Sequence, residues 1–146
     1  LRLTGAVAML NARIVTFASA LWWGSLTAIG FMAVPLLFKF LPTPALAGNM
    51  AGRLFTAQTW LSVTCGVALL LATKGAAVAG AGRARATLFA VVLGMLLALL
   101  IEFAVAPRIV ARENLRLWHG AGTLMYAVQW LCASFVLWRL AGSRQE

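Results

Sequence analysis

Four long apolar runs constrain this chain more than any other feature of its sequence. They cover residues 14–38, 54–72, 86–106 and 117–138. Each has about the 20 residues that an α-helix needs to cross the hydrocarbon core of a bilayer. The runs do not alternate as barrel strands would, and lipid offers no partner to an unpaired backbone group. We therefore predict an all-α membrane protein, a four-transmembrane-helix bundle with up-down topology and short loops.

Composition supports lipid as the solvent of these helices. Hydrophobic residues make up 63% of the 146 residues, and the mean hydropathy is +0.94. A soluble domain of this size has too much surface to hide that much apolar area. The net charge of +9 would suggest nucleic-acid binding in a soluble protein, but the basic residues lie in short clusters between the apolar runs. Such clusters are typical of loops that meet anionic lipid headgroups, so we expect no nucleic-acid partner.

Loop-forming residues separate the four runs, and the whole chain, residues 1–146, is predicted to be a single domain with one span at each run. Pro42 and Pro44 break the chain after the first run, the basic and glycine-containing segment 73–85 follows the second, and Pro107 closes the third. Proline cannot continue a helix without losing a hydrogen bond, so these positions predict helix ends. We see no convincing internal repeat, although two hairpins of two helices are a natural description.

Small residues recur every four positions on two of the predicted helices. Ala20, Gly24 and Ala28 share one line on the first helix, and Gly94 and Ala98 share one on the third. Such lines let helix backbones approach closely where lipid provides no hydrophobic drive for association. We predict that they are helix-packing residues, either within the bundle or against a partner subunit.

Tryptophans and cysteines in the runs are predicted to pack. Trp22 and Trp23 lie in the middle of the first run, where they are expected to contact other helices or a partner. Cys65 and Cys132 each lie deep in an apolar run, with no CxxC or other metal-ligand spacing, so they are expected to act as small packing residues.

Polar residues inside the runs form one candidate site. Glu102 is the only one of the 15 Asp, Glu, Lys and Arg residues that falls inside a run, and His119 is the only histidine. The helical rise of about 1.5 Å per residue places Glu102, His119 and Gln58 near one level of the membrane. Tyr126 lies on the same helical face as His119. A bundle with these faces inward would hold Glu102, His119, Gln58 and Tyr126 together, with a basic or hydrogen-bonding partner for Glu102 among His119, Arg53 and Arg108.

Three interpretations of this polar cluster remain open. Its members can cross-link the helices, each such bond contributing roughly 0.6 kcal/mol. They can bind a quinone headgroup, a lipid headgroup or a metal ion, or they can carry protons. One histidine and one carboxylate make a poor transition-metal site, so no metal ligand and no cofactor are assigned. Phosphate-loop, HExxH and GxSxG motifs are absent and only three residues are acidic, so we do not expect an enzyme.

A set of residues spread along the chain resembles a known family. In order they are Trp23-Gly24, Phe31, Pro35-Leu36-Leu37-Phe38, Ala47-Gly48, Leu54-Phe55, Pro107 and His119-Gly120. Together they resemble the DUF4149 group of small bacterial membrane proteins, which is similar to the eukaryotic TMEM-205-like proteins. A looser likeness links the Trp-Gly and Pro-Phe stretch to the CopD copper-resistance membrane domain, although this chain has about half that family's spans and no metal-ligand cluster. The resemblance implies a four-helix membrane fold in a bacterial inner membrane, and no particular activity.

These observations favour a protein that functions by packing against other membrane components. We expect a non-enzymatic inner-membrane protein, an accessory or structural subunit that packs against a larger respiratory or photosynthetic complex or against lipids. Its partners are then membrane lipids and other membrane protein subunits. The alternative is a small oligomeric transporter, or a protein that binds quinone, lipid or metal, built on the Glu102–His119 cluster.

The distribution of basic residues predicts the orientation of the bundle. Seven Lys and Arg residues fall on the side of the termini and the 73–85 segment, and five on the side of the other two loops. Because cytoplasmic loops carry the excess of positive charge, both termini are expected in the cytoplasm. Single cysteines at positions 80 and 113, in a chain lacking Cys65 and Cys132, test this with a membrane-impermeant thiol reagent on intact cells. Position 113 should react and position 80 should not, and the reverse pattern would contradict the prediction.

Overall fold

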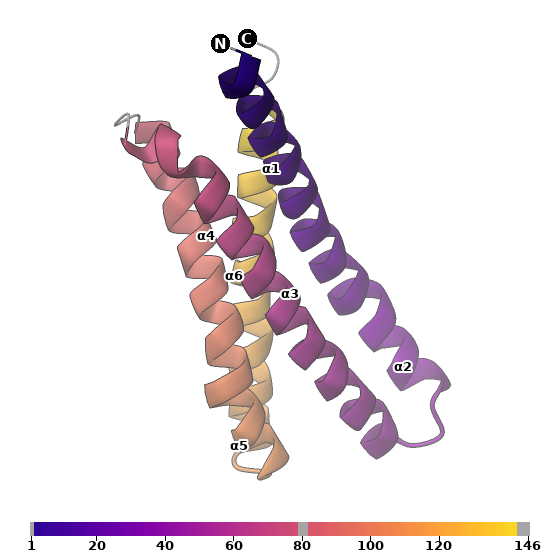
Figure 1. The fold of residues 1–146 in the computed structure, drawn as a ribbon. Coiled ribbons are helices and arrows are strands. Elements are labelled where there is room, and N and C mark those ends of the chain that lie inside the picture. The colour runs from indigo at the N-terminus through magenta and orange to yellow at the C-terminus, as the bar shows by residue number, and fades with distance from the viewer. Residues whose placement is uncertain (1, 79–81, 143–146) are drawn as a thin grey trace.

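Four continuous helical spans make up the protein in the computed structural model, which describes residues 2–78 and 82–142 (Figure 1). The first span joins α1, the π-helical turn η1 and α2. The second is α3, the third joins α4, the π-helical turn η2 and α5, and the fourth is α6. Their bounds are α1 Arg2–Ala28, η1 Ile29–Ala33, α2 Val34–Phe40, α3 Pro44–Val78, α4 Gly82–Leu100, η2 Ile101–Val105, α5 Ala106–Val110 and α6 Leu115–Gly142.

All four spans are long and apolar enough to cross a membrane. The qualifying segments of the described chain are Met9–Phe40, Pro44–Thr73, Ala84–Val110 and Leu115–Gly142. The predicted all-α bundle of four transmembrane helices is confirmed. Every helix extends beyond the apolar run that predicted it, because hydropathy marks only the part in hydrocarbon, whereas capping decides where a helix ends.

The first loop shows how capping sets these ends. Leu41 is extended, with φ −80° and ψ 144°, as the residue before a proline is required to be. The Thr43 hydroxyl then accepts a hydrogen bond from the Leu46 N–H at 3.2 Å, and Pro44 occupies the first turn of α3. The second helix therefore starts well before residue 54. Its other end runs through Val78 and α4 resumes at Gly82, so most of the predicted 73–85 loop is helical and residues 79–81 lie outside the described part.

Two prolines lie inside the spans and not at their ends. Pro35 and Pro107 each come two residues after a π-helical turn, η1 and η2 respectively. Proline lacks an N–H and its ring presses on the carbonyl four residues back, and a wider turn before it accommodates both defects. The helix continues past each proline, so the expectation that Pro107 closes the third span is wrong. That span ends instead where Arg112 and Asn114 adopt positive φ angles of 57° and 32°.

These prolines belong to an internal repeat that our sequence analysis missed. The pattern I-x-F-x-x-x-P occurs at residues 29–35 of the first span and again at 101–107 of the third. The pattern A-x-x-W-L occurs at 57–61 of the second span and at 127–131 of the fourth. The aromatic residues of the two copies pair crosswise, edge to face. Phe31 meets Trp130 with ring centroids 5.6 Å apart, and Phe103 meets Trp60 at 6.4 Å.

Crosswise pairing relates the two halves of the molecule by an approximate two-fold axis along the bundle. One half is the hairpin of the first two spans and the other is the hairpin of the last two, as Figure 1 shows. Both hairpins start from the same end of the bundle, which is the arrangement of parallel repeats in membrane proteins. Position 30 in the first copy thus corresponds to position 102 in the second, and position 56 to position 126.

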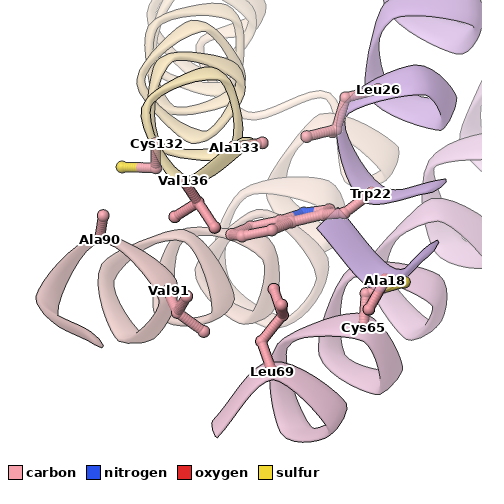
Figure 2. Close-up of a cluster of buried hydrophobic side chains, with 10 residues drawn as sticks. All are labelled: Ala18, Trp22, Leu26, Cys65, Leu69, Ala90, Val91, Cys132, Ala133 and Val136. Atoms are coloured by element: carbon pink, nitrogen blue, oxygen red, sulfur yellow. The ribbon is translucent and has the colours of Figure 1, made fainter. Parts of the chain in front are cut away.

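Trp22 is the centre of the packed interior. Its side chain is fully buried, and Figure 2 shows the indole extending from α1 toward the other three helices. The third helix admits the ring only because residue 94 is glycine: a Cβ there would lie 2.6 Å from two indole carbons. The other buried members of this cluster are Ala18, Leu26, Cys65, Leu69, Ala90, Val91, Cys132, Ala133 and Val136.

A matched pair of glycine substitutions tests this packing. Gly94→Ala places a methyl group against the buried Trp22 ring and is expected to lower the free energy of unfolding by about 1–3 kcal/mol. Gly24→Ala is the control, because no atom lies within 4 Å of its Cβ position, and the higher helix propensity of alanine should leave stability unchanged or slightly raised. Unfolding by SDS titration in mixed micelles measures both. Equal tolerance of the two changes would contradict the packing described.

Candidate functional site

A buried polar layer joins three of the four spans. The Gln58 side-chain amide donates to the hydroxyl oxygens of Ser25 at 3.0 Å and Ser62 at 3.1 Å. The Gln129 amide donates to the same Ser62 oxygen at 3.0 Å. Gln58, Ser62 and Gln129 are at most 2% exposed. Ser62 therefore accepts from two amides and connects α3 to α6, while Gln58 connects α3 to α1.

Two polar atoms in this interior have no partner in the described part of the chain. They are the Gln58 side-chain oxygen Oε1 and the Trp22 indole nitrogen Nε1. Both belong to side chains that hold the centre of the bundle. A fully paired layer would be more stable, since a buried unpaired group costs about 1–3 kcal/mol.

Glu102 lies outside this layer, on the π-turn η2, where its side chain faces α3. The Thr56 hydroxyl is 2.9 Å from one Glu102 carboxylate oxygen, to which it donates, and 3.1 Å from the other. Glu102 is half-buried and Thr56 is exposed on the outer surface of the bundle. Glu102 has the hydrogen-bonding partner that we expected, but that partner is none of the three residues we named. Within residues 2–78 and 82–142, no basic group lies within salt-bridge distance of its carboxylate.

Tyr126 occupies the corresponding place in the other half of the molecule. Its hydroxyl donates to the Leu26 carbonyl oxygen at 2.8 Å, and its ring fills the space beside Gly30, whose Cβ position lies 2.5 Å from Tyr126 Cε1. A small residue on the π-turn thus faces a large ring in one half. In the other half, the acid at position 102 faces the small Thr56.

His119 does not join the other predicted site residues. It is exposed near the start of α6, and its Nδ1 is 3.0 Å from the carbonyl oxygen of Leu115 in the same helix. The structure thus distributes Gln58, Glu102, Tyr126 and His119 over four separate environments. Helical rise gave their depth, but it says nothing about the direction in which each helix turns its polar face.

Two of the predicted packing positions are in the interior and three are not. Gly94 receives Trp22, and Ala98 is 1% exposed, with its carbonyl oxygen accepting the Thr59 hydroxyl at 3.4 Å. Ala20 and Ala28 are exposed, and the space beside Gly24 is open. The first-helix line therefore makes no contact with another helix of this chain. Trp22 and Leu26, on the opposite side of α1, occupy that role because their larger side chains fill the centre.

Hollows on the surface are shallow and apolar. One groove of about 360 Å³ runs along the outside of α4 and α6, lined by residues such as Phe89, Leu93 and Leu131. No group of three His, Cys, Asp or Glu residues gathers anywhere in the described chain. The chemistry that remains is hydrogen bonding in the interior and one carboxylate–hydroxyl pair at the surface.

A comparison with protein-family models identifies the relatives of this fold. The model of DUF4149, described as a domain of unknown function, matches residues 17–117. The chain belongs to the DUF4149 family. The match covers both π-turns and ends in the first turn of α6. Comparisons with curated proteins and with solved structures gave no match.

Several residues of this DUF4149 protein's polar contacts escaped sequence reasoning. Thr56 is not among the three candidates named for the partner of Glu102, because an exposed threonine in an apolar run carries no signal of its own. Ser25 was passed over as one hydroxyl among many. The repeated I-x-F-x-x-x-P pattern in the sequence does indicate these contacts. When its two copies are aligned, Glu102 corresponds to Gly30, and the residues that face them are at positions 56 and 126.

Removal of the Ser62 hydroxyl tests the polar layer. Ser62→Ala leaves the buried amides of Gln58 and Gln129 without their shared acceptor, and because an unsatisfied buried group costs about 1–3 kcal/mol, the free energy of unfolding is expected to fall by about that amount. Thr64→Ala is the control on the same helix, because its exposed hydroxyl bonds only to the Trp60 carbonyl one turn back. SDS titration should separate the two variants clearly. Equal stability would mean that the layer contributes nothing to the association of the helices.

Proposed function

We propose that this DUF4149 protein is a non-enzymatic accessory subunit of the bacterial inner membrane. It packs against a larger complex, respiratory or photosynthetic, and against the surrounding lipid. The observation that carries the proposal is the outward position of the Ala20–Gly24–Ala28 line. It offers another membrane helix a surface on which backbones can approach closely, and no helix in the described part of this chain contacts it.

The residues beside this line support a protein contact. Phe17 and Leu21 project on the same exposed side of α1, with exposed fractions of 76% and 54%. Small residues flanked by large apolar ones form a ridge and a groove, which a partner helix can fill more completely than mobile lipid chains can.

The interior supports the same proposal over transport by a single copy. Trp22, Leu26 and Leu69 close the centre of the bundle, each with at most 1% of its surface exposed. The buried side chains of Gln58 and Gln129 both bond to Ser62 and so link helices of the bundle. A closed centre agrees with a protein that functions by binding other proteins through its outer surface.

One observation favours the alternative of a small oligomeric transporter or ligand-binding protein. The Glu102–Thr56 pair faces outward between α3 and η2, where a neighbouring subunit could complete a polar path or site. That function requires several copies around the pair, because the carboxylate is on the outside of one bundle.

Substitution on the first helix tests the accessory role. Gly24→Leu should leave the bundle folded, since the space around its Cβ position is open, but should displace a partner helix by several ångströms. Proteins that co-purify with the parent in mild detergent at fixed stoichiometry are therefore expected to be lost from this variant. Gly120→Leu on α6, where the Cβ position is equally open, is the matched control and should retain them.

The opposite result has a clear meaning. If no protein co-purifies with the parent, or if Gly24→Leu retains its partners as well as Gly120→Leu does, the proposed contact through the first helix is wrong.

A further inference from the structure

The place that Glu102 occupies in one half of the molecule contains no acid in the other half. Its counterpart in the other half is Gly30, and there a hydroxyl from the facing helix bonds directly to a backbone carbonyl. The same joint between hairpins is thus built once without an acid. A carboxylate inside a membrane span costs at least about 2.5 kcal/mol, so its presence requires a reason beyond cross-linking two helices.

The surface around Glu102 contains a second charge, which has no ion-pair partner in the described part of the chain. Arg53, Thr56 and Trp60 follow one another at three- and four-residue intervals along the exposed side of α3. Such spacing puts them on one face of the helix, with Arg53 about 4.5 Å along the axis from Thr56. No acidic group of the described chain lies within salt-bridge distance of Arg53.

Glu102 and Arg53 therefore lie on one surface at similar depths, with opposite charges and with no ion-pair partner for either among the described residues. We call this surface the α3/η2 face, and define it by Arg53, Thr56, Trp60, Glu102 and Phe103. Its apolar part is prominent, because Trp60 and Phe103 form an edge-to-face pair and are 54% and 64% exposed. An apolar patch beside two complementary charges is what an interface between subunits requires.

We propose that the α3/η2 face binds a second copy of this chain. A two-fold axis along the membrane normal keeps equal depths together, so the Glu102 carboxylate of each copy pairs with the Arg53 guanidinium of the other. The interface is self-complementary, as a two-fold contact must be. The dimer then contains two such ion pairs, so each of the four charges has one partner, and the exposed rings of the two copies cover one another.

The backbone of α3 permits this approach. Gly48 and Gly52 precede Thr56 at four-residue intervals on the exposed side of the helix, and no atom lies within 4 Å of either Cβ position. Two α3 helices can therefore cross closely near Arg53. The contact uses a different helix from the Ala20–Gly24–Ala28 line, so the dimer does not depend on the proposed accessory role.

Charge reversal tests the pairing. In lipid nanodiscs or mild detergent, the parent is expected to be dimeric by light scattering or native mass spectrometry. Glu102→Arg and Arg53→Glu should each weaken dimerisation by about tenfold or more, since two reciprocal pairs are lost and like charges meet. The double variant Glu102→Arg/Arg53→Glu restores opposite charges across the interface and should recover most of the dimer. Arg112→Glu, in the third loop, is the control and should remain dimeric.

Cross-linking gives a second readout that does not rely on these charges. In a chain with Cys65 and Cys132 replaced by alanine, a cysteine at position 60 should form a disulfide-linked dimer under mild oxidation. A cysteine at position 131, on the outside of α6, should not. A monomeric parent, single reversals that dimerise as the parent does, a double variant that stays monomeric, or cross-linking at 131 in place of 60 would each overturn the proposal.

Discussion

Backbone hydrogen bonding in lipid is the constraint on which the rest of this structure depends. A backbone N–H or C=O group that is unpaired in hydrocarbon cannot bond to water instead, so every residue of a span must remain in a helix. Proline has no backbone N–H, so at positions 35 and 107 a hydrogen-bond donor is missing within a span. A π-turn precedes each proline, and the helix continues beyond it, to Phe40 in the first span and to Val110 in the third. Those turns also change the direction in which the following side chains point, and they set Gly30 and Glu102 against the neighbouring helix.

Association of the helices then rests on shape and on few polar bonds. Trp22 fills the centre because Gly94 leaves room for it, and a ring of small residues (Ala90, Ala98 and Ala133 among them) lets the other helices approach. Ser62 accepts from Gln58 and Gln129, which ties three spans at one level. In lipid such contacts replace the hydrophobic drive that assembles a soluble bundle. The consequence for function is a closed interior, with the remaining chemistry on the outside of the bundle.

The approximate symmetry of the two halves makes Glu102 conspicuous, because the corresponding residue of the other half is Gly30. Phe31 with Trp130 and Phe103 with Trp60 are the same contact made twice, and Tyr126 beside Gly30 corresponds to Thr56 beside Glu102. Where the two halves agree, the residues serve packing. Where they differ, the difference is open to another use, and at position 102 one copy has an acid where the other has Gly30. This reasoning needs both copies of the repeat, and a single hairpin would not have singled out that carboxylate.

Sequence alone determined the class of this protein and the number of its spans, because the length of an apolar run and the thickness of a bilayer are fixed quantities that need no knowledge of neighbours. Two of the residues predicted to pack, Gly94 and Ala98, lie in the interior. Helix ends were less accessible, since Thr43 and Pro44 start α3 by local capping that hydropathy does not register. Only the tertiary structure decided which face of each helix turns inward. A spacing of three or four residues defines a face but not its direction, so Gln58 became buried, His119 exposed, and the Ala20–Gly24–Ala28 line faced outward. Those directions are set by contacts between residues far apart in the chain, such as Trp22 with Gly94 and Gln129 with Ser62.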